Sequence, residues 1–143
     1  MLRRIISTSS SWAPLFLRLA LGIAFIGHGA QKVFGKFNGP GWAKWTALTA
    51  YVPFSFMRPA SLWLGAAAVS ELVGGALVLL GFLTRLGAFL IICVMLTAIR
   101  VLWPAYFAPG GFELASVMLA MALALLIMGG GQLSVDRIIS RRR

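Results

Sequence analysis

Cysteine and histidine are almost absent from this sequence, which contains one of each, Cys93 and His28. A lone cysteine excludes a disulfide within the chain, and this pair cannot supply the usual ligands of a zinc or iron–sulfur site. Haem ligation by two histidines is excluded in the same way. We therefore expect no metal and no intrinsic cofactor. Cys93 lies in an apolar stretch, where a buried thiol forms little thiolate, so we expect it to be inert.

Acidic residues are also scarce, with 3 Asp and Glu against 13 Lys and Arg and a net charge of +10. Such a balance invites a nucleic-acid interpretation, which requires the basic residues to form one face. Here they bracket apolar runs instead, as is typical of topology signals and of contacts with anionic lipids. We therefore expect the lipid bilayer as a partner and no nucleic acid.

Long apolar runs dominate the rest of the chain, which is 60% hydrophobic with a mean hydropathy of +0.93. A soluble domain of 143 residues could not bury that much apolar surface. Glycine and proline clusters divide the runs into segments long enough to cross a bilayer. The sequence predicts an all-α fold, a four-transmembrane-helix antiparallel bundle in a single membrane domain over 1–143. The expected spans are 13–34, 59–80, 85–103 and 112–128, followed by a basic cytoplasmic tail over 132–143.

The distribution of basic residues predicts the orientation. The side that holds both termini and the turn at 81–84 carries more arginine and lysine than the opposite side, which favours cytoplasmic termini. We expect a multi-pass protein of the inner membrane of a bacterium or archaeon. The first outer loop should form a short surface or re-entrant helix, or an aromatic loop at the interface. The expected headgroup or partner contacts are Arg137, Arg141, Arg142, Arg143, Trp42 and Trp45. Ser134 and Asp136 could cap a short helix in the tail.

Ionisable side chains interrupt the apolar spans. Each costs at least about 2.5–3.5 kcal/mol near the bilayer centre, so such residues usually face the bundle interior and mark function. Helical spacing places them on stripes shared with small residues, which allow close packing of helices in lipid. The charged residues are Arg18, His28, Lys32, Glu71, Arg100 and Glu113, and the packing glycines are Gly22, Gly29, Gly74 and Gly75.

Five of these ionisable residues, all except Arg18, should converge on a polar pocket that opens outward. We expect Glu71 to pair with Lys32 or Arg100, and Glu113 to pair with the other. The fourth span should pack through a stripe that begins at Glu113 and includes Ser116, Ala120 and Ala124. In the alternative interpretation the ion pairs only fix helix register, and Arg18, Lys32 and Arg100 extend to lipid headgroups.

The order of the motifs resembles the DoxX family of small four-helix membrane proteins. The matching segments are Arg18–Gly22, Gly27–Gly35, Glu71–Gly81, Thr84–Arg85, Phe112–Glu113 and Gly129–Asp136. This resemblance implies a link to thiosulfate:quinone oxidoreductase, to membrane redox and thiol-stress complexes, or to membrane assembly. Fold transfers across such a family better than activity does.

These observations leave alternative functions open. We expect a non-catalytic accessory or anchoring subunit of a redox-linked membrane complex, with other membrane protein subunits as partners and no catalysis of its own. The alternatives are a quinone-binding subunit, with His28 and Lys32 as hydrogen-bond donors and Glu71 or Glu113 as proton relays, and a membrane-protein assembly factor. A quinone or a bound lipid is the expected ligand. Electrons would come from a partner subunit, because side chains alone do not carry this chemistry.

Overall fold

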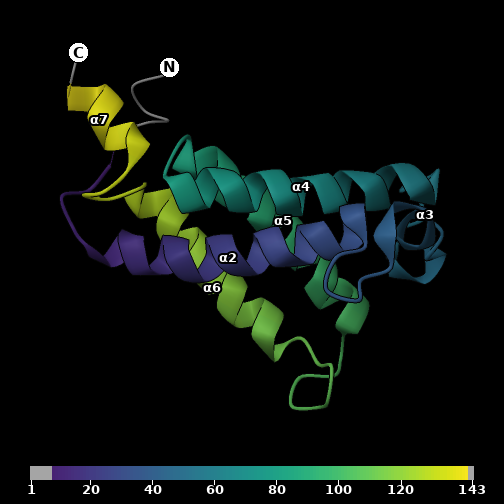
Figure 1. Cartoon of the computed structure of the whole chain (residues 1–143). Coiled ribbons are helices and arrows are strands. Elements are labelled where there is room, and N and C mark those ends of the chain that lie inside the picture. Colours follow the sequence, from purple (N-terminus) through teal and green to yellow (C-terminus); the bar gives the residue numbers. More distant parts are fainter. Residues whose placement is uncertain (1–7, 142–143) are drawn as a thin grey trace.

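The computed structural model describes residues 8–141, and the predicted all-helical class is confirmed within that range (Figure 1). A short helix, α3, occupies the first long loop, followed by one 3₁₀ turn, η1. Helix bounds agree with the predicted spans to within one residue. The helices are α2 (Ala13–Phe34), α3 (Gly41–Thr46), η1 (Thr49–Tyr51), α4 (Ala60–Leu80), α5 (Thr84–Leu102), α6 (Glu113–Met128) and α7 (Val135–Arg141).

Within the described residues, α2, α4 and α5 are long and apolar enough to cross a membrane. Helix α6 is apolar but has only 16 residues, which corresponds to about 24 Å at the helical rise per residue. Glycines in the left-handed conformation end α2 at Gly35 and α4 at Gly81, both with a φ of 66°. This conformation is costly for a residue with a Cβ atom, so the glycines fix these ends.

Helices α2 and α4 lie side by side, and their contact depends on glycine (Figure 1). A Cβ atom added to Gly22 would lie 2.6 Å from the Cβ of Leu79, and one added to Gly29 would lie 2.6 Å from the backbone nitrogen of Leu72. Gly75 meets α2 in the same way, and Gly74 faces the carbonyl of Gly87 on α5. All four glycines that the sequence singled out therefore lie at helix–helix contacts.

Helix α6 packs through a different face from the one predicted. Its buried residues are Ala115, Ala122 and Leu125, which contact the core formed by α2, α4 and α5. Glu113 and Ala120 are exposed, so the predicted stripe that begins at Glu113 is wrong. Because α6 is apolar on every side, its sequence pattern gave no reliable direction.

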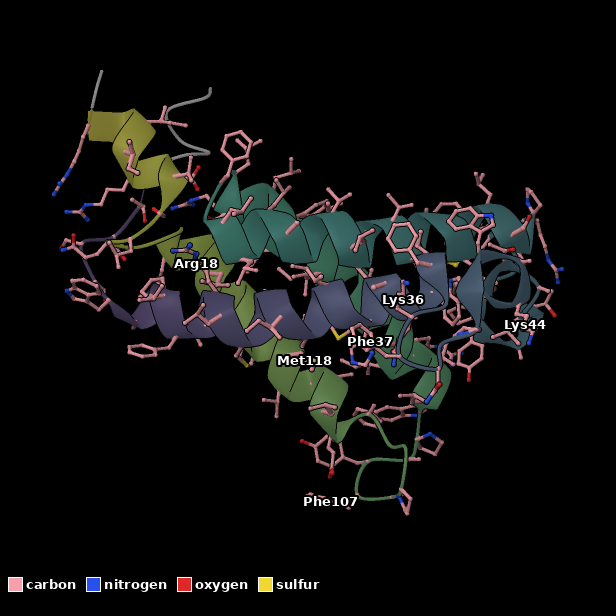
Figure 2. The ribbon with its side chains drawn as sticks, in the orientation of Figure 1. Arg18, Lys36, Phe37, Lys44, Phe107 and Met118 are labelled. Atoms are coloured by element: carbon pink, nitrogen blue, oxygen red, sulfur yellow. The ribbon has the colours of Figure 1, made fainter. Side chains whose placement is uncertain are left out.

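The bundle has two dissimilar ends. Helix α7 lies at one end, where its Arg137 is bonded to Ser9, and α3 lies at the other (Figure 1). Helix α6 runs obliquely away from α2 toward the loop at 103–112, whose tip carries Phe107 (Figure 2). In Figure 2, Arg18 lies toward the α7 end and Lys44 lies at the α3 end.

Candidate functional site

An ion pair joins α2 to α4 near the α3 end of the bundle. The ammonium of Lys32 donates hydrogen bonds to both carboxylate oxygens of Glu71, and only 3% of Glu71 is exposed. Lys32 is one of the two partners predicted for Glu71. The close approach of Gly29 to Leu72 allows the two helices to bring these side chains together.

Trp45 covers the ion pair from the first long loop. The Lys32 Nζ atom lies 4.5 Å from the centre of its indole ring, a cation–π contact. The indole Nε1 donates a hydrogen bond of 2.7 Å to the carbonyl of Leu64 on α4, which fixes the ring in place. The ring of Tyr51 packs against that of Trp45, with the two ring centroids 5.6 Å apart.

A cavity of about 400 Å³ lies beside the ion pair, between the first long loop, α4 and α5. Trp45 and Tyr51 line it from the loop, together with Val52 and Met57, and Lys32 and Glu71 are the charged residues of its lining. Small residues make room for it, because Ala66 and Ala67 on α4 face Ala98 on α5. Its size falls at the lower end of the range for small-molecule sites.

The other predicted members of the cluster do not line this cavity. His28 is exposed, with its Nδ1 atom 3.1 Å from the side-chain oxygen of Gln31. Arg100 and Glu113 are exposed, and neither forms an ion pair within residues 8–141. The structure therefore brings Lys32 and Glu71 together, with His28 near enough to interact electrostatically with Glu71, whereas the second predicted ion pair does not form within residues 8–141. Arg100 lies in the last turn of α5 and Glu113 is the first residue of α6, so both lie at helix ends beside the loop, where they are not buried.

Cys93 also differs from expectation. The sequence predicts a buried thiol, yet Cys93 is exposed on α5 and lines the cavity one helical turn from Thr97. The hydroxyl of Thr97 donates to the carbonyl of Cys93 at 3.0 Å, so this hydroxyl is already bonded within its own helix.

Arg18 occupies the opposite end of α2 and is 3% exposed. Its guanidinium donates to the carbonyls of Val78 and Leu79 at the end of α4, and to those of Gly130 and Leu133 after α6, at 2.6–2.9 Å. The alternative in which Arg18 extends to headgroups is therefore wrong. Carbonyls at a helix end lack partners within the helix, and a planar guanidinium can bind several of them at once.

Asp136 adds further hydrogen bonds at the same end of the bundle as Arg18, which we call the closed end. Its carboxylate accepts hydrogen bonds from the backbone of Leu83 at 2.8 Å, and from the backbone and hydroxyl of Thr84 at 2.9 and 2.8 Å. It thus caps the start of α5, whereas the Ser134 hydroxyl accepts the bond from the Arg137 backbone that begins α7. Sequence reasoning considered only a cap for the tail helix. The signal that it missed is that Asp136 is one of 3 acidic residues in the chain.

The predicted headgroup contacts lie in varied surroundings. Arg137 is half-buried and donates to the carbonyl of Ser9 at 3.2 Å, whereas Arg141 is exposed. Arg142 and Arg143 lie outside the described residues. Trp42 is 46% exposed and packs its ring against Gly65 of α4, so it belongs partly to the fold.

Comparison with known proteins identifies the family. The DoxX family model matches residues 13–104, which cover more than half of the chain. The chain belongs to the DoxX family. A further match, an uncharacterised membrane protein of Mycobacterium tuberculosis, is 29% identical over an alignment 153 positions long, which covers 97% of this chain and 88% of that protein. No solved structure matches.

Family membership and the apolar helices together identify an integral membrane protein. The DoxX match includes α2, α3, α4 and α5, and therefore every residue that lines the cavity. Helix α6 and the segment that contains Asp136 lie beyond it.

Proposed function

We propose that this DoxX-family protein is a non-catalytic accessory subunit of a redox-linked membrane complex, and that its cavity holds a membrane-soluble ligand, a quinone or a lipid, for that complex. The observation that carries the proposal is the combination of a cavity of about 400 Å³ with the Lys32–Glu71 ion pair in its lining, where Glu71 is buried and Lys32 is half-buried. An ion pair that served only to fix helix register would not require adjacent space.

The residues at the cavity suit an amphiphilic ligand. Alanine and valine side chains would receive an apolar ring or tail, and a few polar side chains complete the lining. Lys32 and the hydroxyls of Ser70 and Tyr51 can donate hydrogen bonds to oxygen atoms of the ligand, which is the usual division of roles in small-molecule sites. A quinone would supply electron and proton transfer when bound, and Glu71 could hold a proton beside it.

A partner subunit follows from the residue inventory. With one cysteine and one histidine, the chain has too few ligands for the metal clusters and haems that usually deliver electrons to quinones. We therefore assign electron delivery to another membrane subunit. The exposed apolar surface of the four apolar helices, α2, α4, α5 and α6, offers contacts with such a subunit as well as with lipid.

The proposal includes an orientation. The four apolar helices would cross the inner membrane as an antiparallel bundle with both termini in the cytoplasm. This placement rests on the excess of basic residues around the termini and Arg85. The cavity would then open toward the outer half of the bilayer, because it lies at the α3 end.

The test is to purify the protein in mild detergent, extract the bound amphiphiles and measure them per mole of protein by mass spectrometry. Ala67→Phe fills the cavity from α4 and should lower the retained quinone or lipid by roughly tenfold, because the ring occupies the ligand's space. Val73→Phe is the matched control, since Val73 is 43% exposed on the same helix and lies outside the cavity.

Circular dichroism and size-exclusion chromatography establish that both variants are folded before the comparison. Equal ligand content in the wild type and in Ala67→Phe would overturn ligand binding. Mild-detergent purification also tests the accessory role, because a redox-active membrane subunit should co-purify in fixed ratio. Recovery of the protein alone after chemical cross-linking in native membranes would contradict that role.

A further inference from the structure

The charges at the cavity carry an inference about its ligand. Among the described residues that line the cavity, only Lys32 and Glu71 are charged. They neutralise one another, because both Glu71 oxygens accept hydrogen bonds from the Lys32 ammonium. The ion pair therefore gives the cavity strong donors but no net charge.

A negatively charged head group does not suit a site beside the Lys32–Glu71 ion pair. It would have to share Lys32 with Glu71, and its charge would lie beside a carboxylate that is 3% exposed. Repulsion between like charges is strong where water is excluded. A cationic head group would meet the same difficulty with Lys32.

Several hydrogen-bond donors at the cavity remain available to a ligand. The hydroxyls of Ser70 and Tyr51 line the cavity and have no hydrogen-bond partner among the described residues. An ammonium has three donor hydrogens, and Glu71 takes two of those of Lys32. The donors of Trp45 and Thr97 are already bonded to the carbonyls of Leu64 and Cys93. The unused polar groups thus call for a neutral acceptor such as a ketone oxygen.

We infer that the cavity selects an uncharged, carbonyl-bearing amphiphile and rejects anionic ones, so that quinones fit and fatty-acid anions or anionic phospholipids do not. This inference rests on the proposed function, because it assumes that the cavity binds a ligand. It narrows that function to one class of ligand. It also predicts that the selectivity depends on Glu71 and is lost when the carboxylate is removed.

Cys93 provides the measurement, because it is the sole cysteine and lines the cavity. The rate of its alkylation by N-ethylmaleimide is followed by mass spectrometry in detergent micelles, with three probes of similar chain length. The probes are undecan-2-one, a benzoquinone that carries a decyl chain and has no free ring position, and undecane-1-sulfonate, which is always anionic. The two neutral probes should slow the alkylation roughly fivefold at concentrations a few times their dissociation constants, and the sulfonate should leave the rate unchanged.

The matched control replaces Cys93 with alanine and introduces a cysteine at Val117, which is 55% exposed on α6 and lies outside the cavity. Alkylation at that position should not respond to any probe. In Glu71→Gln, the charge of Lys32 is no longer balanced, so the sulfonate should now slow the alkylation of Cys93 by a similar factor.

The outcomes separate the inference from the proposed function. Protection by the sulfonate in the wild-type protein, equal to that by the neutral probes, would overturn the selectivity and leave ligand binding intact. No protection by any probe would overturn both. If Glu71→Gln does not fold, the wild-type comparison still decides the inference, and a folded Glu71→Gln that does not bind the sulfonate would contradict the role of the carboxylate.

Discussion

Arg18 and Lys32 lie on one face of α2, 14 residues or about four turns apart, and their surroundings differ. Arg18 is bonded to four backbone carbonyls, and the cavity lies away from it. Lys32 is bonded to one carboxylate beside a cavity of about 400 Å³. At the closed end of the bundle, the buried cation of Arg18 therefore links the end of α4 to the segment that follows α6. At the other end, which we call the open end, the cation of Lys32 is neutralised by Glu71 and lies beside a cavity.

The largest effect that this comparison predicts follows from Arg18→Leu. The carbonyls of Val78, Leu79, Gly130 and Leu133 would lose their donor in a buried place, so we expect a loss of about 3–5 kcal/mol in the free energy of unfolding. Unfolding in detergent, followed by circular dichroism, measures it. Arg18→Lys should recover only part of the loss, because lysine has fewer donors and no planar fork. A variant as stable as the wild type would refute the closing role.

A smaller effect is expected at the open end. Lys32→Met leaves the buried Glu71 carboxylate without a cation and should lower the free energy of unfolding by about 2–3 kcal/mol. The double variant Lys32→Met/Glu71→Gln should come within about 1 kcal/mol of the wild type, because it removes both charges together. The same unfolding assay applies. If the double variant loses the sum of the two single effects, the residues do not interact as a pair.

Asp136→Asn should weaken the closed end by about 1–2 kcal/mol, since asparagine offers one neutral acceptor where the carboxylate serves three donors of Leu83 and Thr84. Hydrogen exchange at the amides of Leu83 and Thr84 should become faster while exchange in the middle of α4 stays unchanged. Ser134→Ala is the control, because Ser134 caps α7 instead. Faster exchange at Leu83 in Ser134→Ala but not in Asp136→Asn would show that Asp136 does not cap α5.

The smallest effects are expected at Arg100 and Glu113, which take part neither in the Arg18 contacts nor in the Lys32–Glu71 ion pair. Arg100→Gln and Glu113→Gln should each change the free energy of unfolding by less than about 0.5 kcal/mol, because both side chains are exposed and unpaired within residues 8–141. Their effects should add in the double variant, which unfolding in detergent will test. A coupling energy above 1 kcal/mol would mean that the predicted Arg100–Glu113 pair forms after all.

The sequence predicted α2 well because charge and glycine mark the same face. Arg18 and Lys32 require polar partners deep in the bundle, and Gly22 and Gly29 allow the neighbouring helix to approach. On α6 the corresponding argument failed. Glu113 begins the helix at a loop, so its charge does not have to be buried and says nothing about which face packs.

Helical periodicity predicted a pocket that contains Lys32 and Glu71, but it could not predict the boundary of the cavity. Its boundary depends on the path of the loop at 45–57, where the backbone brings Trp45 and Tyr51 over α4. Such a path is set by tertiary contacts and leaves no repeating pattern in the sequence. The role of Asp136 was missed for a related reason, because its hydrogen bonds reach residues 52 and 53 positions earlier in the chain.

The bonds of Arg18 and Asp136 also impose an order on biosynthesis. The segment at 130–136 is translated after α6, yet it supplies two of the carbonyls that bind Arg18 and the carboxylate that caps α5. A nascent chain that has inserted only its first three long helices therefore holds an arginine with unused donors and an uncapped helix. The contacts at this end of the bundle are therefore complete only after residue 136 has been translated.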